Sequence, residues 1–233
     1  MTEIAVVTDF SVGDMWDKLP EYTKQAKALG VATADLYTAT GLYYQQGLDT
    51  NAAMSAGVET MKMARIAGLE AADATDAMTS AVRGFGMAVD ETSTTRVNDV
   101  YSELAAISAT DVEELSTAMS KTASLAHSVN MEFENTAAFL AAGIEATRES
   151  ADSIGTSLKT VLARMNEIKS DPNKIVDVDG ETVDANKVDA ALKSVGITML
   201  DANKQFRDAD DILLELSSKW DSLSTMQRRY VAT

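Results

Sequence analysis

The sequence predicts an all-α protein, a multi-helix bundle of short antiparallel helical hairpins with one or two small β-hairpins near residues 174–207. Apolar residues make up 45% of the 233 positions and aromatic residues only 6%, with Ala, Thr, Met, Leu and Ser at the apolar and small positions. This composition favours helices, because strands favour aromatic and β-branched residues. Apolar residues also recur every three or four positions, and Gly or Asn ends several of these stretches.

The helix ends are marked by a Gly or Asn that is followed by an apolar residue. This pair is typical of a Schellman C-cap, because Gly and Asn tolerate positive φ and the apolar residue packs back onto the last turn. The pairs are Gly30-Val31, Gly47-Leu48, Gly68-Leu69, Gly86-Met87, Asn130-Met131 and Gly196-Ile197. The early stops lie about 17 to 21 residues apart, which predicts one helix and one tight turn per unit. No sequence motif repeats with them, so we assign no named repeat family.

In chain order, the sequence predicts helices at about 14–29, 33–46, 50–67, 70–85, 91–108, 111–128, 132–148 and 151–168. Thr110 and Glu113 have the spacing of a capping box at the start of the sixth helix. The last three helices each show one apolar stripe with polar residues opposite. The stripes are Val112, Leu115, Met119, Ala123 and Ala126; Phe133, Ala137, Leu140 and Ile144; and Ile154, Leu158, Val161, Leu162 and Met165.

The pattern changes after residue 170. Residues 175–178 and 181–183 alternate around Asp179-Gly180, which predicts a β-hairpin with a type I′ turn. A short helix at about 185–195 follows, and then a second hairpin candidate with short strands at 197–200 and 205–207, joined by 201–204. A further helix is expected at about 209–223, and a last one begins near Thr225. The apolar face of the 209–223 helix is Ile212, Leu213, Leu216, Trp220 and Leu223.

These elements suggest three regions: a helical hairpin bundle at 1–170, a β-hairpin and short-helix insertion at 171–207, and terminal helices at 208–233 that pack on the bundle. The stretch Gln227–Thr233 reads as the start of a helix without a stop signal. We therefore expect the chain to be a fragment of a longer protein.

Composition excludes several classes of protein. There is no cysteine, which excludes disulfides and thiolate metal sites, and a single histidine, His127, leaves no multi-histidine site. No apolar run reaches the length of a membrane span, and residues 1–10 lack a secretory signal, which favours folding in a cytoplasm. The net charge of -16 argues against static binding of duplex DNA. Because the charge is spread along the helices, we interpret it as solvated helix faces.

Two motifs have the residue types of a metal or proton-transfer site. Asp177, Asp179, Gly180 and Glu181 partly resemble a calcium loop, but they lack its ligand before the glycine and its distal bidentate glutamate, so a hairpin turn is the expected role. His127 lies at the end of a predicted helix, where the helix dipole favours imidazolium, and a capping or surface role is expected.

The remaining candidates indicate structure as well. Gly84-Phe85-Gly86 lacks the preceding strand and third glycine of a dinucleotide fingerprint and fits a helix end. No Gly-x-Ser-x-Gly motif anchors a hydrolase triad. Paired carboxylates such as Glu113-Glu114 and Asp210-Asp211 carry little signal in so acidic a chain, and Arg148 and Arg228-Arg229 are expected to be solvated or ion-paired. The sequence thus predicts no catalytic, cofactor or metal site.

Several segments, taken in order, resemble the core region of phage tail tape measure proteins. They are Gly41–Leu48, Thr60–Leu69, Ala77–Phe85, Arg96–Ala106, Ala118–Ala126, Gly155–Met165, Gln205–Arg207 and Leu213–Trp220. The resemblance extends from about residue 9 to the end. It implies a structural virion protein whose full chain lies inside the tail tube, sets tube length and leaves ahead of DNA at ejection.

The resemblance also implies partners: the tube protein, tail assembly chaperones, a distal tail protein and further copies of the chain, with assembly in the host cytoplasm. Contact with the host membrane at ejection would involve regions outside this stretch. The sequence departs from the family in having no long unbroken heptad tract, so we expect a compact assembly or ejection module here and a length-counting tract elsewhere. Two alternatives remain: a peptidoglycan-degrading entry domain, and a helical interaction module of a non-phage assembly.

Overall fold

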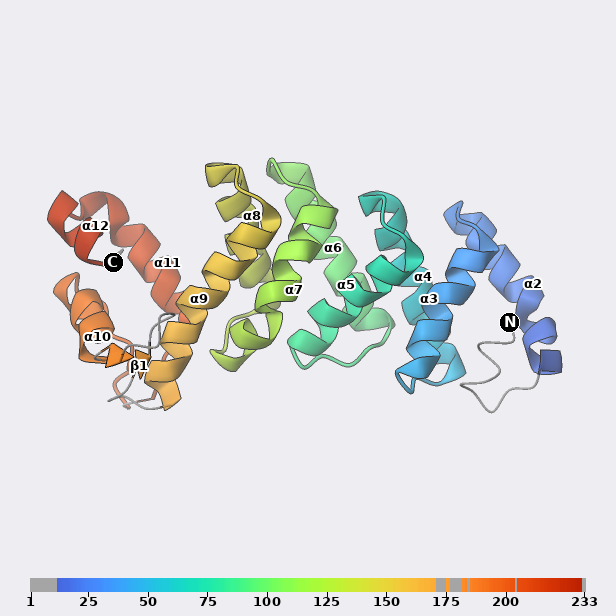
Figure 1. Ribbon diagram of the computed structural model, residues 1–233, viewed down its shortest axis with the longest axis horizontal. Coiled ribbons are helices and arrows are strands. Elements are labelled where there is room, and N and C mark those ends of the chain that lie inside the picture. Colours follow the sequence, from blue (N-terminus) through green and yellow to red (C-terminus); the bar gives the residue numbers. More distant parts are fainter. Residues whose placement is uncertain (1–11, 171–174, 177–181, 184, 204, 232–233) are drawn as a thin grey trace.

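The protein is a row of helical hairpins that follow one another along the longest axis of the molecule (Figure 1). A computed structural model describes residues 12–170, 175–176, 182–183, 185–203 and 205–231. Its helices are α2 (Val12–Leu29), α3 (Thr33–Gln45), α4 (Thr50–Ala67), α5 (Ala71–Gly84), α6 (Glu91–Ile107), α7 (Val112–Ser128), α8 (Phe133–Thr147), α9 (Ala151–Ser170), α10 (Ala185–Ser194), α11 (Ala209–Lys219) and α12 (Thr225–Val231), with a 3-10 turn η1 (Trp220–Ser222).

The all-α prediction is confirmed, and each helix predicted before residue 170 is present with bounds that differ by at most two residues. The Schellman stops are also confirmed. Gly30, Gly47, Gly68, Gly86, Asn130 and Gly196 all have φ between 58° and 86°. In each case the amide of the following apolar residue donates to a carbonyl five residues earlier, as from Leu69 to Ala64 at 2.9 Å.

An acidic residue stands directly before each helix from α4 to α8, and these residues are spaced 20 or 21 positions apart. They are Asp49, Glu70, Asp90, Asp111 and Glu132. A carboxylate there is favoured by the positive end of the helix dipole, and the Asp side chains accept hydrogen bonds from unpaired helix amides. This start signal recurs with the unit of one helix and one turn that the stop signals predict, and it makes the spacing of that unit more regular.

The predicted capping box at Thr110 and Glu113 is wrong by one residue. The N-cap of α7 is Asp111, which accepts from the Glu114 amide at 2.8 Å, while the Glu114 carboxylate accepts from the Asp111 amide at 3.2 Å. Both pairs fit the spacing of a capping box, and the Asp111 register makes Val112 the first residue of α7 and buries it. The Thr110 hydroxyl donates to the Glu114 carboxylate instead.

The helices form two layers. Helices α3, α5, α7 and α9 pack on one another in order and make one layer, while α2, α4, α6 and α8 make the other. Each helix therefore contacts its hairpin partner and the next helix of its own layer, as in α-solenoids. The predicted hairpins thus stack side by side along one axis, because each has neighbours to pack against on two sides.

Small residues allow the helices to approach closely. A Cβ on Gly155 of α9 would lie 2.5 Å from the Ala118 carbonyl oxygen of α7, and one on Gly84 of α5 would lie 2.4 Å from the Ala123 Cβ. The predicted stripes of α7 and α8 are buried. In the predicted stripe of α9, Ile154, Leu162 and Met165 are buried and Leu158 is half-buried. Val161 is 44% exposed, because it is rotated by about 100° from the buried Leu162 next to it.

The predicted β structure is much smaller than expected. Strands β1 (Ile175–Val176) and β2 (Thr182–Val183) pair antiparallel, with Ile175 opposite Val183, while the Asp179-Gly180 turn lies outside the described residues. The prediction of a second hairpin with strands at 197–200 and 205–207 is wrong, because only one isolated bridge, between Leu200 and Phe206, forms there among the described residues. Segments this short leave the backbone few ladder hydrogen bonds. The predicted division at residues 170 and 207 stays a prediction.

Candidate functional site

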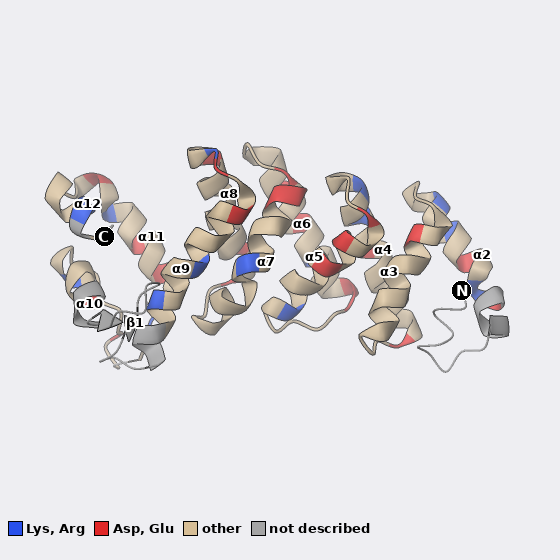
Figure 2. Cartoon of the chain, in the orientation of Figure 1, with Lys and Arg blue, Asp and Glu red and all other residues tan. Residues whose placement is uncertain are grey.

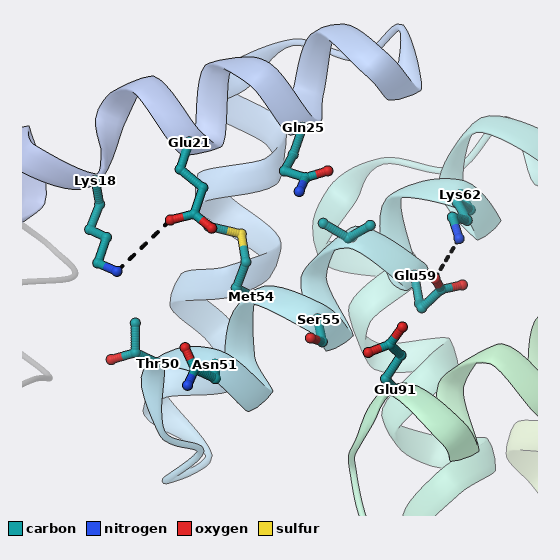
Figure 3. Close-up of a pocket in the computed structure, with 11 residues that line it drawn as sticks. Lys18, Glu21, Gln25, Thr50, Asn51, Met54, Ser55, Glu59, Lys62 and Glu91 are labelled. Atoms are coloured by element: carbon teal, nitrogen blue, oxygen red, sulfur yellow. Dashed lines mark hydrogen bonds and ion pairs between the residues drawn. The ribbon is translucent and has the colours of Figure 1, made fainter.

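A groove lies among α2, α4 and the start of α6, in the layer of even-numbered helices (Figure 3). Its volume is about 470 Å³. Its lining residues are Lys18, Glu21 and Gln25 from α2; Thr50, Asn51, Met54, Ser55, Val58, Glu59 and Lys62 from α4; and Glu91 from α6. Helix α4 supplies most of this lining, since it lies between α2 and α6 in its layer.

The groove combines a small apolar surface with charged walls. Met54 and Val58, one turn apart on α4, are half-buried and apolar. Lys18 and Glu21 of α2 form an ion pair at 3.8 Å on one wall, and both are substantially exposed. Such a pair contributes little to stability because water screens it. The groove can therefore exchange this ion pair for contacts with a ligand at low cost.

Glu59 is the one buried carboxylate of the groove lining, at 6% exposure. It is ion-paired with Lys62 one turn away, and the Asn98 side chain of α6 donates to its carboxylate at 3.1 Å and to its carbonyl oxygen at 2.9 Å. These partners compensate the loss of hydration that a buried charge suffers. Glu59 thereby joins α4 to α6 and fixes the distance between two walls of the groove.

A second hollow of about 470 Å³ lies along α6 and shares Glu91 with the groove. It is lined by Glu91, Thr92, Thr95, Arg96, Asp99 and Val100. Arg96 forms a two-pronged ion pair with Glu134 of α8, from Nε to Oε1 at 2.5 Å and from Nη2 to Oε2 at 2.6 Å. These hydrogen bonds lower the pKa of Glu134 and raise that of Arg96. The positive charge of Arg96 is therefore already neutralised by Glu134 of α8.

Two carboxylates keep an uncompensated charge: Glu91, which lines both hollows, and Asp99, which lines the second. Glu91 and Asp99 are exposed on α6, and within the described part of the chain neither forms an ion pair. Figure 3 shows Glu91 of α6 on the same side of the groove as Glu59 of α4, whose carboxylate is turned toward Lys62. The cations of the lining, in contrast, are all engaged with carboxylates. The groove therefore presents excess negative charge to an incoming ligand.

His127 and the Gly84-Phe85-Gly86 segment lie at the ends of helices, as the sequence predicts. His127 lies in the last turn of α7, exposed, with its ring 6.2 Å from that of Phe85. Phe85, between the two glycines at the end of α5, is buried and packs edge-on against Phe133 at 5.4 Å. Both positions agree with helix-end roles. The calcium-like residues 177–181 lie outside the described residues.

The paired carboxylates and the arginines lie apart from the groove. Glu114 completes the capping box of α7, and Asp210 is buried at 4% exposure, where Asn135 donates to it at 2.7 Å. Arg148 donates to the Ala109 carbonyl oxygen at 3.2 Å and so joins two turns at one edge of the stack. Arg228 donates to the Trp220 carbonyl oxygen at 2.9 Å. None of these residues is brought together with another candidate.

The described residues contain no group of three or more His, Asp or Glu side chains placed to hold a metal ion. No described helix has the length and apolar character needed to cross a membrane. Acidic and basic residues are interspersed along the stack in Figure 2, in agreement with the interpretation of solvated helix faces.

Sequence reasoning did not find the groove or the Arg96–Glu134 ion pair. The two residues are 38 positions apart, and the groove depends on how α2 sits against α4. A partial signal existed, because acidic N-caps at intervals of 20 or 21 residues indicate helices of similar length. That α4 and α6 are neighbours in one layer follows only from the contacts between the helices.

Comparison with known proteins gives a consistent result. The family of phage-related minor tail proteins matches residues 24–233. A tape measure protein of Pneumococcus phage Dp-1 is 29% identical over 119 residues, which cover 51% of this chain and 10% of that protein. The chain thus matches about a tenth of the length of this curated relative. No solved structure matches the chain.

Proposed function

The chain belongs to the family of phage-related minor tail proteins, and from this premise we propose that it is part of a tail tape measure protein that acts structurally and not as an enzyme. The observation that carries the proposal is the family match over residues 24–233, together with the similarity to a tape measure protein. The fold supports it: a two-layer stack of hairpins offers long surfaces and a groove for protein contacts.

In this proposal the protein takes part in tail assembly, in length determination and in DNA ejection. Its partners are the tube protein, the tail assembly chaperones, the distal tail protein and further copies of itself. It assembles in the host cytoplasm and ends in the lumen of the tail tube, and any membrane contact at ejection falls to other regions. The net charge of -16 supports a lumen component that does not bind DNA statically.

We further propose that this region does not itself count tail length. As one unbroken helix of about 1.5 Å per residue, it would span about 350 Å, but its helices stop at about every twentieth residue. Continuing a helix through each glycine costs only about 1 kcal/mol. The larger obstacle is the apolar stripes, which stabilise the stack at roughly 25 cal/mol per Å² buried and would need new partners if the hairpins opened.

The proposal is tested by mass spectrometry of purified tails from a phage or prophage that encodes the chain. Peptides from residues 24–233 should be recovered, and an amber mutation early in the chain should abolish tails of normal length in electron micrographs. Tails of normal composition and length in that mutant would contradict a structural role. Genes for a tube protein, assembly chaperones and a distal tail protein should also lie alongside, which separates the proposal from a non-phage helical module.

The enzyme alternative needs its own test. The groove is the place where a carboxylate pair could act on a polysaccharide, because Glu59 and Glu91 both line it. A zymogram and a turbidity assay on cell walls should show no clearing with the purified chain. Clearing that disappears in Glu91→Gln, with the fold intact, would establish the peptidoglycan-degrading alternative instead.

A further inference from the structure

The groove has the features of a binding surface for a cationic side chain. Lysine and arginine bury their aliphatic stems on apolar surface and keep the charge near water. Met54 and Val58 provide such a surface on α4, while Glu21, Glu59 and Glu91 surround it. Lys18 and Lys62 are held by Glu21 and Glu59, so Glu91 has no cation of its own among the described residues.

The position of the second uncompensated carboxylate, Asp99, determines the spacing of the positive charges on the ligand. Asp99 follows Glu91 by eight positions on the same helix, which places it about 12 Å further along the axis of α6. Both residues line the same hollow, with Thr95 between them. A ligand that carries two positive charges about 10–12 Å apart can therefore engage both ends.

We infer that the groove formed by α2, α4 and α6, together with the hollow along α6 that shares Glu91 with it, binds a basic segment of another protein. One Lys or Arg stem of this segment lies on Met54 and Val58, and its charges face Glu91 and Asp99. This inference rests on the proposed function only in taking the groove as a protein-binding surface. Anionic partners do not fit, because the uncompensated carboxylates and the net charge of -16 repel phosphate groups of nucleic acids and lipids. A basic protein segment has the matching charge.

The probe is a fluorescein-labelled helical peptide of Ala and Gln with two lysines seven residues apart, which spaces their charges by about 10.5 Å on one face. Its binding to the purified 233-residue chain is measured by fluorescence anisotropy at low ionic strength. A second peptide carries two glutamates at the same positions. Glu91→Gln/Asp99→Asn removes the uncompensated carboxylates, and Ser55→Lys places a cation inside the groove.

The matched control is Asp73→Asn/Asp76→Asn. These carboxylates are exposed on α5 in the other layer, so the control changes the net charge by the same amount away from the groove. Circular dichroism melts of every variant establish that it is folded. Should the double groove variant fail to fold, Glu91→Gln alone is used, because it leaves the Asp90 cap of α6 intact.

The lysine peptide should bind, and the glutamate peptide should not. The groove variant should weaken binding by about three- to tenfold, as expected for two exposed ion pairs, and Ser55→Lys should abolish it. The control variant should bind like the parent chain. If binding of the lysine peptide were weakened equally in the groove and control variants, the overall negative charge of the chain would explain the binding. That result would overturn the inference. Absence of binding would overturn it too, while recovery of the chain from purified tails would leave the proposed function standing.

Discussion

Gly155 of α9 lies directly on the backbone of Ala118 in α7, so that a Cβ at position 155 would come within 2.5 Å of the Ala118 carbonyl oxygen and 2.9 Å of its Cα. In an unconstrained helix Gly→Ala stabilises by about 1 kcal/mol. Here Gly155→Ala should instead lower the free energy of unfolding by about 1–3 kcal/mol, because the rigid backbone of α7 must move. Urea denaturation measures this, with Ser157→Ala on the exposed side of α9 as control. A stabilised Gly155→Ala variant would mean that the two helices pack less closely.

The glycine stops give a prediction that depends on φ alone. Gly47 and Gly68 have φ of 86° and 71°, and a Cβ would meet nothing within 4 Å at either position. Gly47→Ala and Gly68→Ala should each destabilise the chain by roughly 1 kcal/mol, since an L-residue resists this conformation. Asn tolerates it better, so Gly47→Asn should lose less than Gly47→Ala in thermal melts. Neutral effects of alanine at both positions would mean that the helices do not end there.

Two buried tyrosines, Tyr43 and Tyr101, differ in whether the hydroxyl has a hydrogen-bond partner. The Tyr43 hydroxyl is hydrogen-bonded to Thr60 Oγ1 at 2.6 Å, whereas the Tyr101 hydroxyl is buried without a hydrogen-bond partner. Tyr43→Phe should cost about 1 kcal/mol, while Tyr101→Phe should be neutral or stabilising, because it removes a hydroxyl that lost its hydration on folding. Chemical denaturation of the two variants checks this. A larger loss for Tyr101→Phe than for Tyr43→Phe would contradict the described packing.

The same side chains predict a loss of stability at alkaline pH. Burial raises the pKa of Tyr43 from 10.0 to about 12 and raises that of Tyr101 further. Above pH 10 the unfolded chain releases tyrosine protons that the folded chain retains, so the free energy of unfolding should fall as pH rises from about 10 toward 12. Absorbance at 295 nm should show these tyrosines ionising only as the chain unfolds. Their ionisation in a folded chain, judged by circular dichroism, would show that they are accessible.

Much of the local structure is predictable from sequence, because helix stops and apolar stripes are encoded within about 20 residues. Asn130 illustrates this: its position before an apolar residue predicts positive φ, and φ is 58°. Arg148 has the same φ without a recognisable signal, since Arg is not favoured there. The two layers, the groove and the ion pair of Arg96 with Glu134 depend on contacts between helices that are distant in sequence. Local periodicity carries no information on such contacts.

The central claim, that this region works as a folded module and does not count tail length, is tested most directly by tail length in a deletion mutant. An in-frame deletion of 49–89 removes α4 and α5 and joins Leu48 to the Asp90 cap of α6, which preserves the alternation of the two layers. A second mutant lacks an equal number of residues from a helical tract outside this region. Electron micrographs should show tails of unchanged length for the first deletion and tails shorter by about 60 Å for the second. Viable phage with equally shortened tails from both deletions would contradict the claim.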